Sequence, residues 1–109
     1  MLAYVNNDTG VCNIATEGSD YWAPNTMLDQ IILHALEDFR ARVHSYPLDL
    51  SLEQWKGILE HICFWLDKSI KEEMCTLPEA EQASWGEDEE IEVEQMRYML
   101  FLWWGHFWD

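Results

Sequence analysis

The chain has 109 residues, a length that suits a single domain with one hydrophobic core. Aspartate and glutamate number 21 against six lysines and arginines, giving a formal net charge of -15. This charge argues against direct nucleic-acid binding through phosphates and favours a basic partner.

Two short segments near the N-terminus predict a β-hairpin. Residues 2–5 and 11–15 are rich in strand-forming types, and residues 6–10 between them favour a turn. The hairpin is assigned to residues 1–17 and is expected to dock on helices, because an isolated hairpin is marginal in water. Residues 18–109 form the predicted helical core. The fold class is therefore mainly α (α+β): a compact three-helix domain with an N-terminal β-hairpin.

A first helix is predicted near residues 26–44. Pro47 ends it, because proline lacks an amide hydrogen and disfavours helical geometry in the preceding residue. Asp29 lies on the face that is expected to contact water. The opposite, core-facing stripe is made of apolar residues at steps of three and four: Leu28, Ile31, Ile32, Ala35, Leu36, Phe39 and Val43.

A second helix is predicted near residues 51–74, where Ser51 and Gln54 fit a capping box. Because the link between the first two helices is short, we expect them to pack antiparallel. The apolar stripe of the second helix comprises Trp55, Ile58, Leu59, Ile62, Leu66 and Ile70.

A short helix is predicted between Pro78 and Trp85, and a third main helix near residues 88–108. The third helix begins with carboxylates, which the positive end of the helix dipole favours, and is apolar on nearly every side beyond Met96. Such a helix is buried centrally or shared between subunits. Four aromatic residues are assigned to a homodimer seam, with burial in the core of one chain as the alternative: Trp103, Trp104, Phe107 and Trp108.

Three features resemble a family of small acidic phage and prophage proteins of Gram-positive bacteria. They are Asp20-x-Trp22, the Tyr46-Pro47 turn that leads to Trp55, and the acidic-to-aromatic segment from Glu94 to Trp108. The resemblance spans residues 20–109 and departs from the family pattern at Glu53-Gln54-Trp55, which is less acidic, and at Trp103-Trp104, where tyrosine and phenylalanine are usual. It implies host takeover or anti-defence activity and carries over no catalytic residue.

An acidic run at the start of the third helix is the leading candidate for partner binding. Its carboxylates imitate the charge of a nucleic-acid backbone and suit a basic groove, whereas the alternative is a solvated helix start. The predicted function is a phage-encoded non-enzymatic protein that antagonises a bacterial defence system by binding a basic, nucleic-acid-binding host protein. The candidate residues are Glu87, Asp88, Glu89, Glu90, Glu92 and Glu94.

A second hypothesis is a sponge that sequesters a nucleotide immune signal. Aromatic faces would stack on the base and carboxylates would accept hydrogen bonds from ribose hydroxyls. The alternative for the same residues is an ordinary core and turn. A phage accessory or structural protein is the third class. The residues of the hypothetical pocket are Asp20, Trp22, Asp29, Tyr46, Trp55 and Trp85.

The sequence predicts no enzyme activity, cofactor or metal. Its cysteines (Cys12, Cys63 and Cys75) lack metal-ligand spacing, and no phosphate loop, nucleophile elbow or zinc-protease helix appears. An odd number of cysteines favours a reducing cytosol. The longest apolar run, residues 99–104, is too short to span a membrane, and the N-terminus lacks a signal-peptide pattern. The predicted location is the cytoplasm of the bacterial host, without membrane contact.

Overall fold

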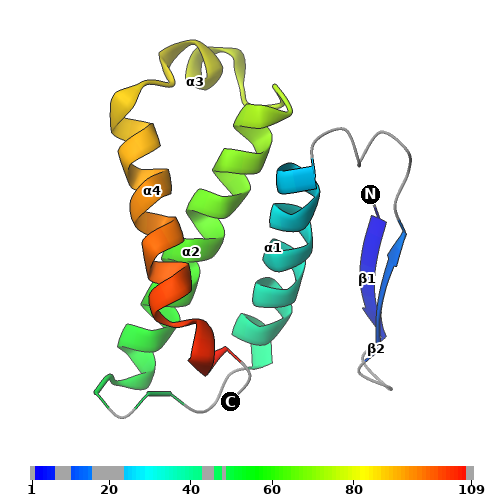
Figure 1. The fold of residues 1–109 in the computed structure, drawn as a ribbon, viewed down its shortest axis with the longest axis vertical. Helices are drawn as coiled ribbons and strands as arrows, with labels where there is room; N and C mark the ends of the chain where they lie inside the picture. Colours follow the sequence, from blue (N-terminus) through cyan, green and yellow to red (C-terminus); the bar gives the residue numbers. More distant parts are fainter. Residues whose placement is uncertain (1, 7–10, 16–23, 43–45, 48, 108–109) are drawn as a thin grey trace.

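The computed structural model describes residues 2–6, 11–15, 24–42, 46–47 and 49–107 (Figure 1). Most of them are helical, which confirms the predicted mainly helical fold. The elements in chain order are β1 (Leu2–Asn6), β2 (Val11–Ala15), α1 (Pro24–Arg42), α2 (Leu52–Glu73), α3 (Glu79–Ser84), α4 (Glu87–Leu102) and the 3-10 turn η2 (Trp104–His106).

Helix α2 lies between α1 and α4 and packs against both (Figure 1). It runs antiparallel to each of them, while α3 crosses from the end of α2 to the start of α4. Strands β1 and β2 pair antiparallel, with Leu2 opposite Ala15 and Asn6 opposite Val11, and β1 contacts α1. Of the predicted turn at residues 6–10, Asn6 belongs to β1, and residues 7–10 lie outside the described residues.

The start of α2 carries the predicted capping box. The Gln54 amide donates to the Ser51 hydroxyl over 3.1 Å, and the Ser51 amide donates to the Gln54 side-chain oxygen over 2.9 Å. These two bonds satisfy backbone donors that no helical carbonyl reaches, so they fix where α2 begins.

The stripe predicted for α2 forms the centre of the core. Ile62 and Leu66 are fully buried and pack with residues of both neighbouring helices. Their buried partners are Leu33 and Leu36 on α1, and Val93, Met96 and Leu100 on α4.

The stripe predicted for α1 is wrong by part of a turn. Leu28 is 53% exposed, whereas Asp29, which was expected to face water, is only 6% exposed. The reason is that Arg97 of α4 pairs with Asp29 inside the helix interface, so a charged pair occupies a position that apolar periodicity assigns to solvent. The buried face of α1 consists of Thr26, Asp29, Leu33 and Leu36.

The predicted third helix is also too long, because α4 ends at Leu102 and the chain continues as η2. The Trp103 amide still donates to the Met99 carbonyl, over 3.1 Å. The chain then turns across the start of α2 towards α1 (Figure 1). This turn lets Phe107 contact both Trp55 on α2 and Phe39 on α1, which a straight helix along α2 would not do.

Candidate functional site

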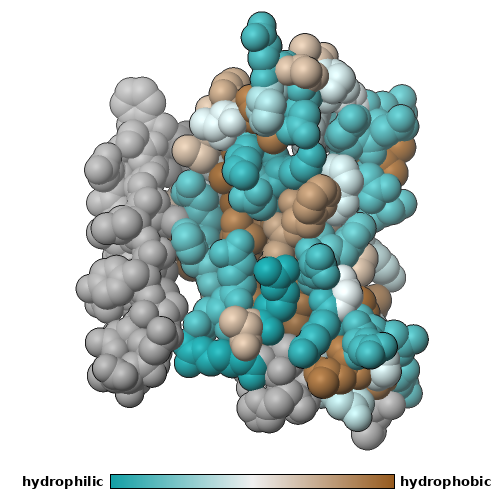
Figure 2. Space-filling view, turned by 180° about the vertical axis from the view of Figure 1, so that it is seen from behind, coloured by the Kyte–Doolittle hydropathy of each residue, from teal (hydrophilic) through white to brown (hydrophobic). Residues whose placement is uncertain are grey.

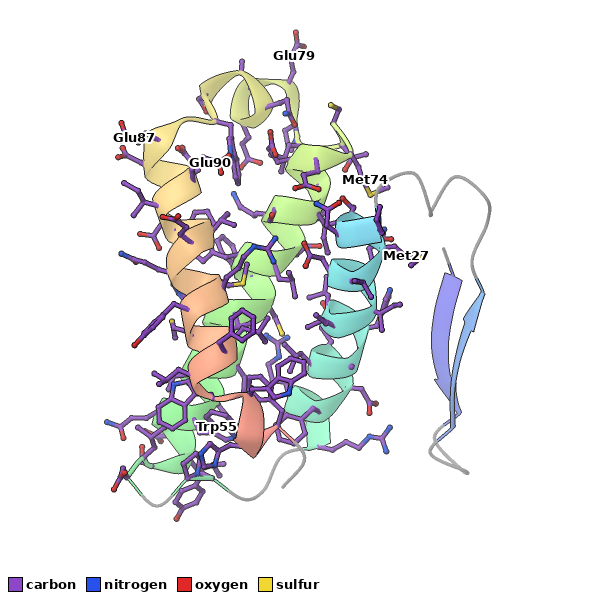
Figure 3. All side chains as sticks on the ribbon, viewed as in Figure 1. Met27, Trp55, Met74, Glu79, Glu87 and Glu90 are labelled. Carbon is purple, nitrogen blue, oxygen red and sulfur yellow. The ribbon has the colours of Figure 1, made fainter. Side chains whose placement is uncertain are left out.

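Carboxylates gather at the end of the molecule where α2 ends and α4 begins. Figure 3 shows Glu79, Glu87 and Glu90 at this end, and Trp55 near the opposite one. Seen from behind, hydrophilic residues cover most of the helical surface, and apolar residues show between them (Figure 2). We call the following residues the acidic end: Glu72, Glu73, Glu79, Glu81, Glu87, Asp88, Glu89 and Glu90.

Two carboxylates of the acidic end accept hydrogen bonds from the residues just before α4. Glu89 accepts a hydrogen bond from the Gly86 amide over 3.1 Å, and Glu90 accepts one from the Trp85 indole nitrogen over 2.7 Å. Glu87 and Asp88 are exposed, and four acidic residues in the first turn suit the positive end of the helix dipole. The acidic run thus contains carboxylates that build the helix start as well as carboxylates that face water.

The remaining predicted partner-binding residues lie further along α4. Glu92 is half-buried and Glu94 is exposed. Glu94 also lines a pocket of about 200 Å³ between α2 and α4, whose carboxylates give it a negative potential that suits an ammonium or guanidinium group. The pocket is lined by Ser69, Glu72, Glu73, Trp85, Glu90, Val93, Glu94 and Arg97.

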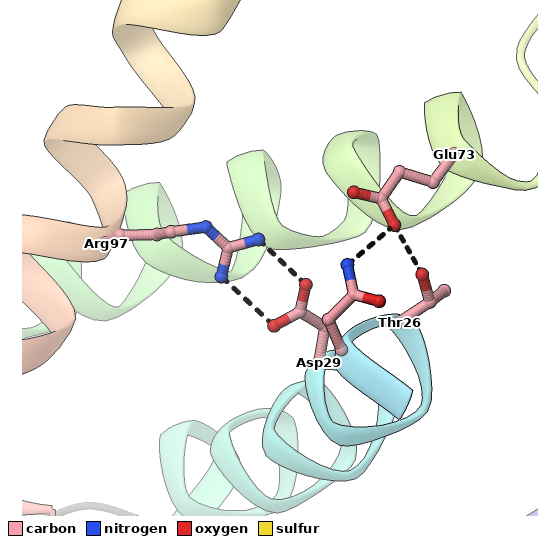
Figure 4. Close-up of polar contacts among 5 residues, drawn as sticks. Thr26, Asp29, Glu73 and Arg97 are labelled. Atoms are coloured by element: carbon pink, nitrogen blue, oxygen red, sulfur yellow. Dashed lines mark hydrogen bonds and ion pairs between the residues drawn. The ribbon is translucent and has the colours of Figure 1, made fainter. Parts of the chain in front are cut away.

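Arg97 binds Asp29 across the interface between α4 and α1 (Figure 4). Two guanidinium nitrogens donate to the two carboxylate oxygens over 3.1 and 2.8 Å, which is a bidentate pair. The hydrogen bond from Arg97 to Asp29 raises the pKa of Arg97 against the opposing effect of burial. Arg97 therefore keeps its charge, and the pair ties together the two helices that flank α2.

Glu73 makes a second tie at the same end. Its carboxylate accepts hydrogen bonds from the Thr26 hydroxyl and, over 3.4 Å, from the Asn25 side chain (Figure 4). The end of α2 is thereby joined to the start of α1. Sequence reasoning missed the roles of Glu73 and Arg97; the available signal was that Arg97 is the single basic residue of α4.

The residues of the hypothetical nucleotide pocket do not converge in the part of the chain that is described. Trp55 is fully buried at the start of α2, whereas Trp85 follows α3 and packs on Trp65, ten residues further along α2. Asp29 is buried in its ion pair, and Tyr46 is 51% exposed. The structure therefore does not bring these four residues together in one pocket. Its other members, Asp20 and Trp22, lie outside the described residues.

Two residues of the predicted homodimer seam pack within the chain. The ring centroids of Trp103 and Phe107 each lie 5.8 Å from that of Trp55. Trp104 is 47% exposed, and Trp108 lies outside the described residues. Trp103 and Phe107 thus pack on Trp55 within one chain, and the homodimer seam stays a prediction.

Cys63 is buried on α2, and burial raises the pKa of its thiol to about 11 from the ordinary value of 9.0. We expect Cys63 to resist thiol reagents until the protein unfolds, because a pKa raised by two units lowers the thiolate fraction about a hundredfold. The measurement is the rate of labelling of a Cys12→Ser, Cys75→Ser variant at about pH 8, with and without urea. Equal rates in the folded and unfolded states would contradict the buried position.

The same raised pKa sets a direction for the pH dependence of stability. Below pH 9.0 the thiol is protonated in both states, and between 9.0 and about 11 it ionises only in the unfolded chain. Stability should therefore fall through this window, and a Cys63→Ala variant should lose that part of the fall.

Comparison with known proteins gives no match to a family model, a curated protein or a solved structure. Within the described residues, no helix has both the length and the apolar character needed to cross a membrane. No group of three or more metal-ligating side chains forms a metal site there either.

Proposed function

We propose that this protein is a non-enzymatic binding protein whose acidic end occupies a basic site on a partner. The supporting observation is that the fold brings carboxylates from α2, α3 and α4 to one end of the molecule. Nearby cations offset little of this charge: Lys68 reaches Glu81 over 3.4 Å, and Lys71 pairs with Asp67 within α2.

Binding at the acidic end depends on the balance between the desolvation of its carboxylates and their attraction to the partner's cations. Exposed carboxylates such as Glu87 and Asp88 retain water, and a partner's lysines and arginines can pair with them without prior loss of an internal partner. A net charge of -15 also produces a field that speeds encounter with a basic surface at low salt.

The partner we propose is a nucleic-acid-binding component of a bacterial defence system, met in the cytoplasm of a phage host. The negative charge of this protein supports a partner site that ordinarily holds nucleic acid, because such a site is basic. The resemblance to phage and prophage proteins supports the defence system as the target. A nucleotide sponge receives no such support, since Trp55 is fully buried and Trp85 packs on Trp65, ten residues further along α2.

The test is a variant that removes charge only from exposed positions of the acidic end: Glu79→Gln, Glu87→Gln and Asp88→Asn. Glu89 and Glu90 are kept because their carboxylates accept hydrogen bonds that stabilise the start of α4. We expect this variant to fold normally and to associate with its partner about tenfold more slowly at low salt, with a smaller difference at high salt. The measurements are capture from host lysate at two salt concentrations and then association kinetics with the captured protein.

A matched control removes the same charge near the start of α2 through Asp49→Asn, Glu53→Gln and Glu60→Gln, which are also exposed positions. Equal slowing in both variants would show that net charge matters and the acidic end does not. Capture that ignores both salt and the acidic-end variant would refute the proposal. A captured protein without a nucleic-acid site would favour an accessory or structural role.

A further inference from the structure

The outer side of α4 carries an exposed stripe on the face opposite to its core contacts. Val93, Met96 and Leu100 face inward and are buried. On the other side, Ile91 is 43%, Tyr98 is 68% and Leu102 is 56% exposed. We call the outer stripe Ile91, Gln95, Tyr98 and Leu102.

The members of the outer stripe follow one another at steps of four, three and four residues. Steps that alternate between four and three residues are those of a coiled-coil seam, in which side chains of one helix insert between those of another. A mainly apolar hollow lies along the middle of the stripe, lined by Glu94, Gln95, Tyr98 and Met99. The outer side of α4 thus offers the spacing of a seam and a shallow, mainly apolar surface.

Tyr98 and Leu102 are more than half exposed, while Ile91 at one end of the outer stripe shares a hollow with Trp65 of α2. Helix α2 contacts the inner side of α4, and β1 and β2 lie beyond α1, away from α4 (Figure 1). Large exposed apolar side chains that form a continuous stripe indicate an interaction surface.

The charges beside the outer stripe are acidic. Glu87 and Glu94 are one heptad apart and flank one side of the stripe, while Asp88 lies on the other side; all three are exposed. The single basic residue of α4, Arg97, turns away to Asp29. A helix placed on the stripe would therefore meet apolar side chains along its middle and carboxylates at its edges.

We infer that the outer stripe binds an amphipathic helix of the partner, with an apolar seam flanked by lysine or arginine. The inference rests on the proposed function, because it specifies the element of the basic partner that docks. A second copy of this chain fits less well, since each copy carries a net charge of -15 and the carboxylates beside the stripe would gain no cation.

The test uses the full chain and a synthetic helical peptide of about three heptads, with leucine at the seam and lysine at the flanks. A second peptide has the same composition in scrambled order, and a third has glutamate at the flanks. We expect only the first peptide to bind tightly, as measured by fluorescence anisotropy. Tyr98→Ser with Leu102→Ser should weaken its binding by more than about tenfold, because exposed aromatic and aliphatic anchors dominate such contacts.

The matched control is Leu28→Ser with Phe64→Ser, which removes exposed apolar side chains from α1 and α2. This control should bind the first peptide like the wild type. Equal binding of the scrambled peptide would overturn the helix site while leaving a basic partner intact. Equal binding of the glutamate-flanked peptide, or of the first peptide to the stripe variant, would also overturn it.

Two further outcomes separate this inference from the proposed function. If no lysine-bearing peptide binds while the salt-sensitive capture from lysate succeeds, the outer stripe is not the docking site and the proposed function stands. Sedimentation that shows a wild-type dimer, and a monomer after Tyr98→Ser with Leu102→Ser, would assign the stripe to a second copy and overturn the inference.

Discussion

Replacing Trp55 with alanine should lower the free energy of unfolding by about 3–5 kcal/mol, the usual cost of removing a large buried aromatic side chain. Trp55 is fully buried, and its ring contacts those of Trp103, His106 and Phe107. The substitution would leave a cavity where the chain after α4 packs on α2. Since domains of this kind hold only about 5–15 kcal/mol of net stability, much of the protein could unfold.

The measurement is urea unfolding followed by circular dichroism, with Trp104→Ala as the control. Trp104 also lies in the aromatic segment but is 47% exposed, so its truncation should cost much less. Similar losses of unfolding free energy in the two variants would contradict the central position of Trp55 in the packing. The comparison also tests whether the aromatic segment is anchored within one chain.

Replacing Arg97 with methionine should lower the free energy of unfolding by about 3 kcal/mol, the lower end of the cost of breaking a buried ion pair. The substitution leaves the Asp29 carboxylate buried without its cation, but the Arg97 side chain itself is 37% exposed. Asp29 is 6% exposed and accepts both of its guanidinium hydrogen bonds from Arg97. Adding Asp29→Leu should restore much of the lost stability, since an apolar pair of similar size has no charge to desolvate. A double-mutant cycle from denaturant unfolding measures the coupling.

The control for this cycle is Lys71→Met, which breaks an exposed pair with Asp67 on α2. Solvated pairs one helical turn apart contribute about 0.3–0.5 kcal/mol, so this variant should unfold near the wild-type midpoint. If Arg97→Met behaves like Lys71→Met, the pair between α1 and α4 does not hold the bundle together. Loss of that pair would also disturb the pocket wall that Arg97 shares with the acidic end.

Local patterns in the sequence were sufficient to predict most of the helices. The capping box of Ser51 and Gln54 depends only on residues three apart, and the α2 stripe depends on the period of one helix. The acidic start of α4 was also visible, because it is a continuous run of residues. For the candidate site, the sequence identified Glu87 and Asp88 as carboxylates but not which of their neighbours face water.

Only the tertiary structure decided the features that join residues far apart in the chain. The pairing of Asp29 with Arg97 placed a residue that was expected to face water inside the helix interface, because burial depends on what a helix packs against as well as on its own apolar period. In the same way, Trp55 determines where Phe107 packs, and α4 ends before the aromatic segment does. The sequence by itself determined local helix starts, apolar stripes and overall charge, whereas contacts between helices decided which carboxylates are buried and which remain for a partner.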